Sequence, residues 1–174
     1  MTTSGAARIA KLVSGGQTGA DRAALDVAIE RHLPHGGWCP RGGWAEDLPT
    51  PPGLLPSYAG LLETPDADSA QRTVWNVRDS DVTLVIAASA GASPGAQLTL
   101  AAAEELGRPH LSVDPTSPDA CERVTRLLES LQPGLVVNVA GPRESEAPGT
   151  YVATRKLLDR VLDGIGPPTP TAAG

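Results

Sequence analysis

The chain has 174 residues, two of them cysteine, and a formal net charge of −6 at pH 7. This length suits one domain with a full core, and the negative charge argues against nonspecific nucleic-acid binding, which needs a basic face. Two cysteines are too few for a disulfide framework. The sequence shows neither a membrane-spanning apolar run nor a secretory signal pattern, so we expect a cytoplasmic protein.

Apolar runs and helical patterns alternate along the chain. In chain order they predict strand 9–13, helix 20–31, an extended piece 34–40, a Gly/Pro-rich loop to residue 56, strand 61–64, helix 66–78 capped by Thr64, strand 82–88, helix 95–106, strand 110–113, a helix from 117–119 to 131, strand 135–139 and helix 151–162. This alternation predicts an α/β fold, a parallel sheet with helices on both faces. We expect one domain over residues 1–163 and a disordered Pro/Thr/Gly-rich tail over 164–174.

A glycine-rich stretch, residues 14–19, joins the first strand to the first helix. Strand, glycine turn and helix is the arrangement in which backbone N–H groups converge on an anion, so we expect a phosphate cradle here. The stretch matches neither the dinucleotide fingerprint nor a Walker loop, and a plain tight turn is the alternative interpretation. Arg22 favours the cradle, because a cation in the first helical turn opposes the helix dipole unless an anion binds beside it.

Two further loops end at the same sheet edge. The loop after the last strand carries Arg143, which either pairs with phosphate or is an ordinary surface arginine. The uncharged loop after strand 82–88 leads into a helix start with Ser93, Gly95 and Thr99, which suits a second anion contact.

Three other groups of residues in the sequence are weaker indications of a functional site. Trp38 and Trp44 flank Arg41, so an aromatic ring is available to stack on a heterocycle, although each tryptophan also suits a core or an interface. His32, His35 and Cys39 lack an evident fourth ligand, and we predict no metal site. Asp21 and Glu46 are candidate general acids or bases, in the way that any exposed carboxylate is.

Several long strings resemble the bacterial family named "putative molybdenum carrier" (molybdenum cofactor carrier-like). They are residues 14–26, 36–42, 45–47, 63–65, 70–81 and 138–145, and the resemblance covers about residues 11–158. It implies a Rossmann-like, doubly wound fold related to the nucleoside-monophosphate phosphoribohydrolase superfamily, and a homo-oligomer, either a dimer or a tetramer.

The chain departs from these relatives in three places. Pro94 stands where the family usually has glycine, which weakens the expected anion contact there. The segment 48–56 is longer than usual, and its role is open, as are the roles of His35 and Cys39. The phosphoribohydrolase signature Pro-Gly-Gly-x-Gly-Thr-x-x-Glu is missing, and neither Glu104 nor Glu105 matches its glutamate, so that activity is not carried over.

These observations favour a carrier that holds molybdenum cofactor (molybdopterin) or a similar phosphate-bearing pterin or nucleotide at the carboxyl ends of the strands. The alternatives are a nucleotide N-glycosidic or phosphoester hydrolase using Asp21 or Glu46, and a module that senses a nucleotide signal. Arg78 is a further cation that could contribute. The candidate binding residues are Ser14, Gly15, Gly16, Gln17, Thr18, Gly19, Arg22, Arg72, Ser93, Gly95, Thr99 and Arg143.

Overall fold

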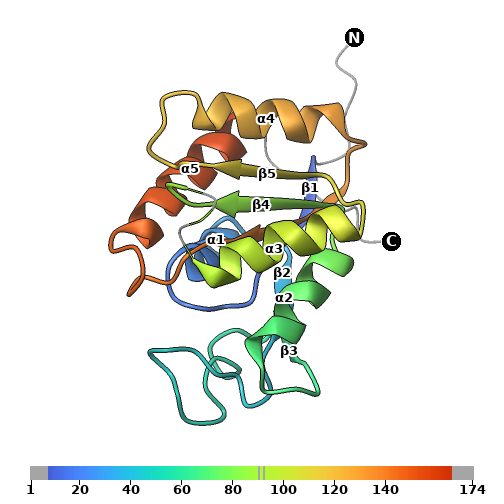
Figure 1. Cartoon of the computed structure of the whole chain (residues 1–174). Coiled ribbons are helices and arrows are strands. Elements are labelled where there is room, and N and C mark those ends of the chain that lie inside the picture. The colour runs from blue at the N-terminus through green and yellow to red at the C-terminus, as the bar shows by residue number, and fades with distance from the viewer. Residues whose placement is uncertain (1–7, 90, 92, 166–174) are drawn as a thin grey trace.

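The computed structural model describes residues 8–89, 91 and 93–165 (Figure 1). Strands and helices alternate through this part of the chain, as the apolar pattern predicts. The elements are β1 (Ile9–Val13), α1 (Ala20–Glu30), β2 (His35–Cys39), β3 (Leu61–Glu63), α2 (Ser69–Arg78), β4 (Val82–Ile86), α3 (Pro94–Glu105), β5 (His110–Val113), α4 (Ala120–Ser130), β6 (Leu135–Ala140) and α5 (Thr150–Ile165).

The described strands form one six-stranded sheet in the order β3-β2-β1-β6-β4-β5, and every pair in it is parallel. The predicted Rossmann-like α/β fold is therefore confirmed. The chain moves outward from β1 to β3, then crosses to β4 on the other side, and β6 fills the gap between β1 and β4. The reversal of strand order creates a crevice beyond the carboxyl ends of β1, β6 and β4, the usual ligand position in open α/β sheets.

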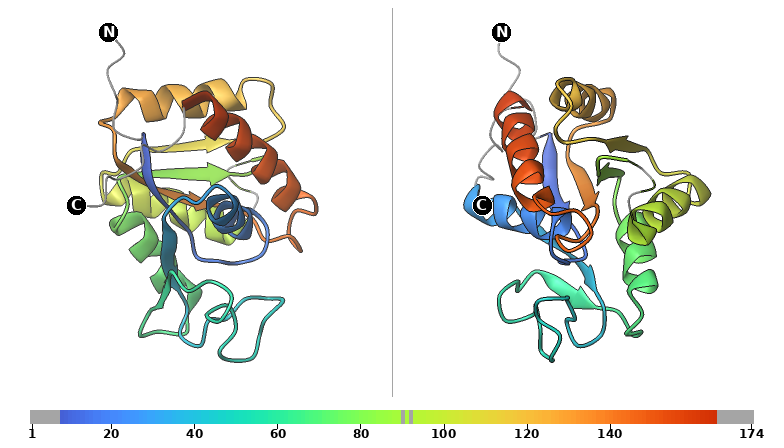
Figure 2. Two further views of the ribbon diagram at one scale, coloured as in Figure 1. Left: turned by 180° about the vertical axis from the view of Figure 1, so that it is seen from behind. Right: turned by 60° about the vertical axis from the view of Figure 1, so that its left-hand side comes forward.

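The two faces of the sheet are covered differently (Figure 2). Helices α1 and α5 pack together on one face and α4 packs against α5 there, around a large core that includes Leu12, Leu84 and Leu157. Helices α2 and α3 pack together on the other face, where the buried contacts are mostly small side chains such as Ala102 and Ala103. Helices α2 and α3 therefore cover this face of the sheet with small apolar clusters of their own.

Several element ends differ from the sequence prediction, three of them most clearly. Helix α2 begins at Ser69 rather than residue 66, because Asp68 and not Thr64 is the N-cap and accepts a hydrogen bond from the Ala70 N–H at 2.8 Å. Strand β4 ends at Ile86, two residues early. Helix α5 continues to Ile165, so the first two residues of the expected tail are helical, and residues 166–174 lie outside the described part.

The long segment between β2 and β3 has an apolar cluster of its own. Leu54 and Ala45 from this segment are fully buried against Leu25 of α1 and Cys39 of β2. This burial raises the pKa of the Cys39 thiol to about 11. The segment is therefore anchored to the domain beside the crevice. Among the described helices, none has the length and apolar character that crossing a bilayer requires.

Candidate functional site

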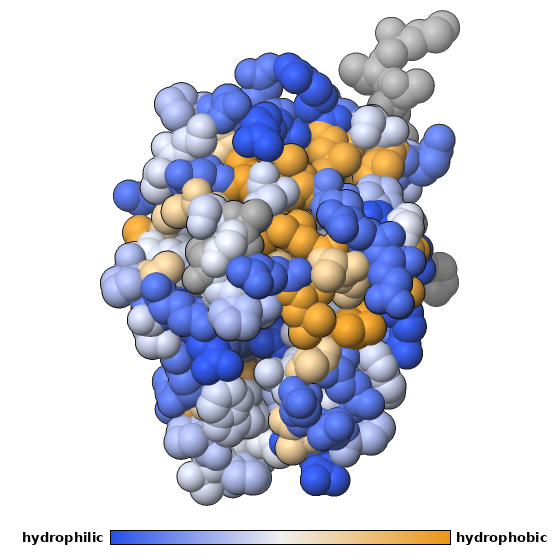
Figure 3. Space-filling model, viewed as in Figure 1, coloured by the Kyte–Doolittle hydropathy of each residue, from blue (hydrophilic) through white to orange (hydrophobic). Residues whose placement is uncertain are grey.

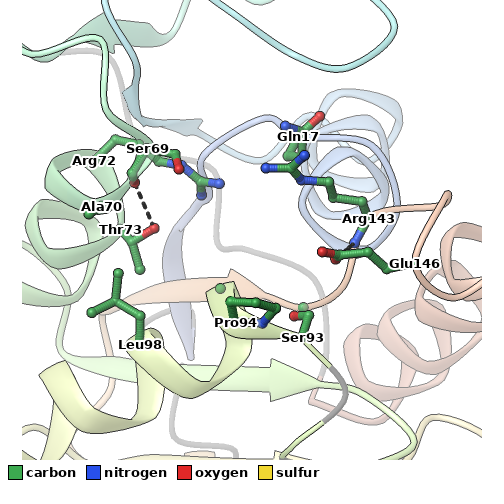
Figure 4. A pocket seen from close by; sticks show the side chains of 12 residues that line it. Gln17, Ser69, Ala70, Arg72, Thr73, Ser93, Pro94, Leu98, Arg143 and Glu146 are labelled. Carbon is green, nitrogen blue, oxygen red and sulfur yellow. Dashed lines mark hydrogen bonds between the residues drawn. The ribbon is translucent and has the colours of Figure 1, made fainter.

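A cavity of about 240 Å³ opens where the carboxyl ends of the central strands meet the first turns of α2 and α3 (Figure 4). We call it the arginine cavity. It is lined by Gln17, Ser69, Ala70, Arg72, Thr73, Ser93, Pro94, Gly95, Leu98, Gly141, Arg143 and Glu146. These residues come from four separate parts of the chain, which only the sheet topology brings together.

The arginine cavity is strongly suited to an anion. The guanidinium groups of Arg72 and Arg143 both point into it, beside the amide of Gln17 (Figure 4). Two helices, α2 and α3, begin at its wall, and each contributes the partial positive charge of its N-terminus. Of the described residues around this cavity, Glu146 alone carries a carboxylate, and one of its oxygens accepts the Arg143 backbone N–H at 2.9 Å.

Arg72 is held in place by a buried carboxylate. Its Nη1 lies 3.1 Å from Oδ2 of Asp21, which is 2 % exposed. Burial raises the pKa of Asp21, while the Arg72 charge opposes that rise. Gly15 makes room for the arrangement, because a Cβ there would lie 1.9 Å from Arg72 Nη1. Within the described residues the Arg72 Nε is buried without a hydrogen-bond partner.

Helix α2 is itself fixed to the sheet by a buried side-chain amide. The Trp38 backbone N–H of β2 donates to Asn76 Oδ1 at 2.8 Å, and Asn76 Nδ2 donates back to the Trp38 carbonyl at 2.9 Å. Asn76 lies one turn after Arg72 on the same side of the helix. The sheet therefore sets the position of the helix that carries Arg72.

The glycine-rich stretch 14–19 is closed on itself. The Gly16 N–H donates to Ser14 Oγ at 3.2 Å, and the Thr18 N–H donates to Gln17 Oε1 at 3.0 Å. The Ser14 N–H donates to the Gly36 carbonyl at 3.0 Å, and the backbone N–H groups of Gly15 and Gln17 lower the pKa of Asp21. Three main-chain donors of the stretch are thus engaged inside the protein, and Gln17, the residue of the stretch that lines the arginine cavity, faces it with its side chain.

Glu46 joins three loops rather than lining the cavity. Its carboxylate accepts hydrogen bonds from the hydroxyls of Thr18 and Ser145, the latter at 2.5 Å, and Thr18 Oγ1 accepts the Glu144 N–H at 3.1 Å. The bonds from Ser145 and Thr18 lower the pKa of Glu46. The loops after β1, β2 and β6 meet at this carboxylate, which is ionised at neutral pH.

The structure separates the sequence-predicted residues into two groups. Gln17, Arg72, Ser93, Gly95 and Arg143 line the arginine cavity. The other candidates do not line the cavity and lie in the loops and helices around it. They are Ser14, Gly15, Gly16, Thr18, Gly19, Arg22, Thr99, Asp21 and Glu46.

Arg22 illustrates the second group. Its Nη1 and Nη2 each lie 2.9 Å from an oxygen of Asp47, and its Nε donates to the Gly16 carbonyl at 3.1 Å. The conflict with the helix dipole is therefore resolved by Asp47, a residue of the long segment. Thr99 likewise donates to the Gly95 carbonyl inside α3, at 2.8 Å.

Several lining residues were not singled out from the sequence. The sequence predicts Ser69, Ala70 and Thr73 inside a helix that begins at residue 66. The Asp68-Ser69 pair is the sequence feature that indicates a helix start at the cavity instead. Glu146 follows Arg143 by three residues and caps its N–H, a spacing typical of local turns. Pro94, which the sequence does mark as a departure from its relatives, lies at the first turn of α3, where its missing N–H removes one donor from the cavity.

No group of three or more His, Cys, Asp or Glu side chains in the described residues is arranged to hold a metal ion. His35 lies at the start of β2, in a shallow hollow with Lys11 and Ile29, away from the arginine cavity. Cys39 is buried at the end of that strand.

The sequence matches a known family over nearly its whole described length. The model of the "Circularly permutated YpsA SLOG family" matches residues 12–162. The chain belongs to this family. A crystal structure from Syntrophus aciditrophicus SB, described as "Putative molybdenum carrier protein", is 42% identical and covers 90% of this chain and 96% of that chain, with a TM-score of 0.80. The predicted membership of the molybdenum carrier-like family is confirmed. No curated protein matches the chain.

Proposed function

We propose that this protein is a carrier that binds a small phosphate-bearing ligand in the arginine cavity. The observation that carries the proposal is the convergence of Arg72, Arg143 and the N-termini of α2 and α3 on one cavity at the switch point of the sheet. Guanidinium groups bind phosphate in bidentate fashion, and a helix N-terminus favours the same negative charge. The similarity to the Syntrophus protein supports a carrier role.

The hydrogen bonding around the two carboxylates considered for catalysis favours binding over turnover. Asp21 is buried and paired with Arg72, and Glu46 accepts hydrogen bonds from two loops. A general acid or base must reach the proton that it transfers, and neither carboxylate lines the arginine cavity. A carrier needs affinity without reaction, and the cavity supplies cations and helix termini for affinity.

Molybdenum cofactor fits this cavity as cargo through its phosphate. Arg72 and Arg143 would hold that phosphate, and the pterin would bring its own ligands to the metal. The described residues hold no group of three or more metal-binding side chains, and the two arginines would act on the phosphate. A nucleotide phosphate would use the same two arginines, and the choice between the two ligands is a matter for experiment.

We further propose that the protein forms a homo-oligomer. On the face shown in Figure 3, apolar side chains gather over α3 and towards the edge strand β5, and Leu106 at the end of α3 is 43 % exposed. A contiguous exposed apolar area of this kind is typical of a protein–protein contact. Light scattering on a size-exclusion column would count the subunits.

The phosphate-binding proposal is tested by calorimetric titration of ribose 5-phosphate into the wild-type protein and Arg143→Gln. Loss of a charge-assisted pair costs about 1.5–3 kcal/mol, so we expect an affinity roughly 10- to 100-fold lower in the variant. Arg126→Gln on the exposed face of α4 is the matched control and leaves the affinity unchanged. Equal affinities of all three proteins would contradict the proposal, and release of free base or inorganic phosphate from a nucleotide would replace the carrier with a hydrolase.

A further inference from the structure

A second cavity of about 430 Å³ adjoins the first. It is lined by Arg41, Gly42, Trp44, Pro49, Pro51, Ala67, Ser69 and Arg143, and we call it the tryptophan cavity. Two of these residues, Ser69 and Arg143, also line the arginine cavity, so the two spaces meet at these side chains. Most of the other lining residues come from the long segment between β2 and β3.

The tryptophan cavity is lined by an aromatic ring, by proline rings and by two cations. Trp44 supplies an indole ring, Pro49 and Pro51 supply rigid apolar walls, and Arg41 adds a second cation beside Arg143. The Arg143 guanidinium lies 5.2 Å from the centre of the Trp44 ring, which is a cation–π contact. Flat rings with polar edges stack on indole and guanidinium groups, whereas a bare phosphate gains nothing from indole or proline.

Trp38, the other tryptophan that flanks Arg41 in sequence, lies elsewhere. Its ring packs edge-on against Trp75 with the centroids 4.8 Å apart, and its indole N–H donates to Asp79 Oδ2 at 2.8 Å. Trp38 lines neither cavity. Trp44 therefore lines a cavity and Trp38 packs against another tryptophan, although both flank Arg41 in the sequence.

We propose that the tryptophan cavity binds a planar nitrogen heterocycle whose phosphate occupies the arginine cavity. This inference rests on the proposed phosphate binding and adds the place where the ring of the ligand, a purine nucleotide or a phosphorylated pterin, is bound. Arg143 belongs to both cavities, so it contacts the phosphate while it stacks on the ring of Trp44. The segment 48–56, whose role the sequence leaves open, forms a wall of this heterocycle site through Pro49 and Pro51.

The test compares adenosine 5′-monophosphate with ribose 5-phosphate, which differ only by the base. Stacking of one base contributes enough to change affinity by about tenfold or more. We therefore expect the wild-type protein to bind the nucleotide about tenfold more tightly than the sugar phosphate, and Trp44→Ala to remove that preference. Trp44→Phe keeps a ring and retains most of the preference. Trp38→Phe is the matched control and retains all of it.

The outcomes separate this inference from the proposed function. If Trp44→Ala weakens both ligands by the same factor, Trp44 acts only by positioning Arg143 and the inference is overturned. Equal affinities of the wild-type protein for the two ligands overturn it as well, while phosphate binding stands. If neither ligand binds, or if adenosine binds as tightly as its monophosphate, the phosphate proposal itself fails. Titration with 6-hydroxymethylpterin monophosphate then tells which of the two heterocycles binds more tightly.

Discussion

The glycine-rich stretch 14–19 and the arginine cavity lie next to each other, yet their polar groups are used in opposite ways. In the glycine-rich stretch, backbone N–H groups bond to Ser14, Gln17 and Gly36 of the same protein. In the arginine cavity, the guanidinium groups of Arg72 and Arg143 face open space. The stretch is a support whose N–H groups already have partners, whereas the cavity beside it presents the Arg143 guanidinium and the Arg72 guanidinium, which Asp21 holds in place, to an incoming anion.

The difference teaches how a conspicuous motif can act indirectly. Gly15 leaves the space in which the Arg72 guanidinium lies, and the stretch holds Asp21, which orients that guanidinium. The glycines thus serve the site by shaping its cationic side chains. Four substitutions test this division between support and site.

The largest effect is expected from Arg72→Met, which belongs to both regions. It leaves the buried Asp21 carboxylate without its cation, and breaking such a pair costs about 3–5 kcal/mol of unfolding free energy at pH 7. Ribose 5-phosphate binding should be lost as well. Urea unfolding at pH 7 and calorimetric titration measure the two losses.

The double variant Asp21→Asn/Arg72→Met is the control for this prediction. It removes the buried charge together with its partner, so it should recover most of the stability but none of the binding. The pH dependence has a definite sign. Without Arg72 the raised pKa of Asp21 rises further, so the deficit of the single variant shrinks as the pH falls through that pKa. A single variant as stable as the wild-type protein at pH 7 would show that the pair is unimportant.

A smaller effect on stability is expected from Gly19→Ala, which changes only the glycine-rich stretch that supports the site. Gly19 has φ +82°, and a Cβ there would lie 2.3 Å from the Pro142 carbonyl oxygen. Backbone strain together with overpacking should lower the unfolding free energy by about 2–4 kcal/mol, measured by urea unfolding.

Gly95→Ala is the matched change in the site. No atom lies within 4 Å of a Cβ at this position, which lines the arginine cavity. Its stability should stay within about 0.5 kcal/mol of the wild type, while the added methyl group weakens ribose 5-phosphate binding. The reverse result, a stable Gly19→Ala and an unstable Gly95→Ala, would invert the assignment of support and site.

The smallest effect is expected from Glu46→Gln, which weakens the junction of the three loops. Because the folded protein lowers the pKa of Glu46, its contribution is fully present above the pKa in the unfolded chain and is lost as the pH falls through the folded-state pKa. We expect a deficit of about 1 kcal/mol at pH 7 that disappears in acid. Glu129→Gln on α4 is the exposed control. A deficit that persists unchanged below pH 3 would mean that charge plays no part in the junction.

Much of the fold could be predicted from the sequence because its apolar runs are unambiguous. Val82–Ile86 is buried throughout, and its continuous apolar character indicates a central strand. The start of α2 was misplaced because Thr64 and Asp68 are both good caps, and only the bond from Ala70 N–H decides between them. Local residue chemistry cannot rank two such candidates.

The candidate site was predicted in part. Arg143 and Ser93 follow strands, and a residue at the carboxyl end of a parallel strand reaches the ligand crevice in any sheet of this class. Arg22 and Asp47 are 25 residues apart, and their pairing depends on how the long segment folds back over α1. The sequence shows no pattern for that return path, so the role of Arg22 could be assigned only from coordinates.

The long segment between β2 and β3 has a consequence for how ligand preference could change over time. It is anchored by a small apolar cluster of its own, around Leu54 and Ala45, which is separate from the main core on the α1, α4 and α5 face. Its free energy of local opening is therefore set by that cluster together with the Arg22–Asp47 pair and the Glu46 hydrogen bonds, and not by the global unfolding free energy. Insertions or substitutions in this segment can reshape the tryptophan cavity while the sheet keeps its register. Ligand selectivity and folding stability therefore depend on different stretches of the chain and can change independently.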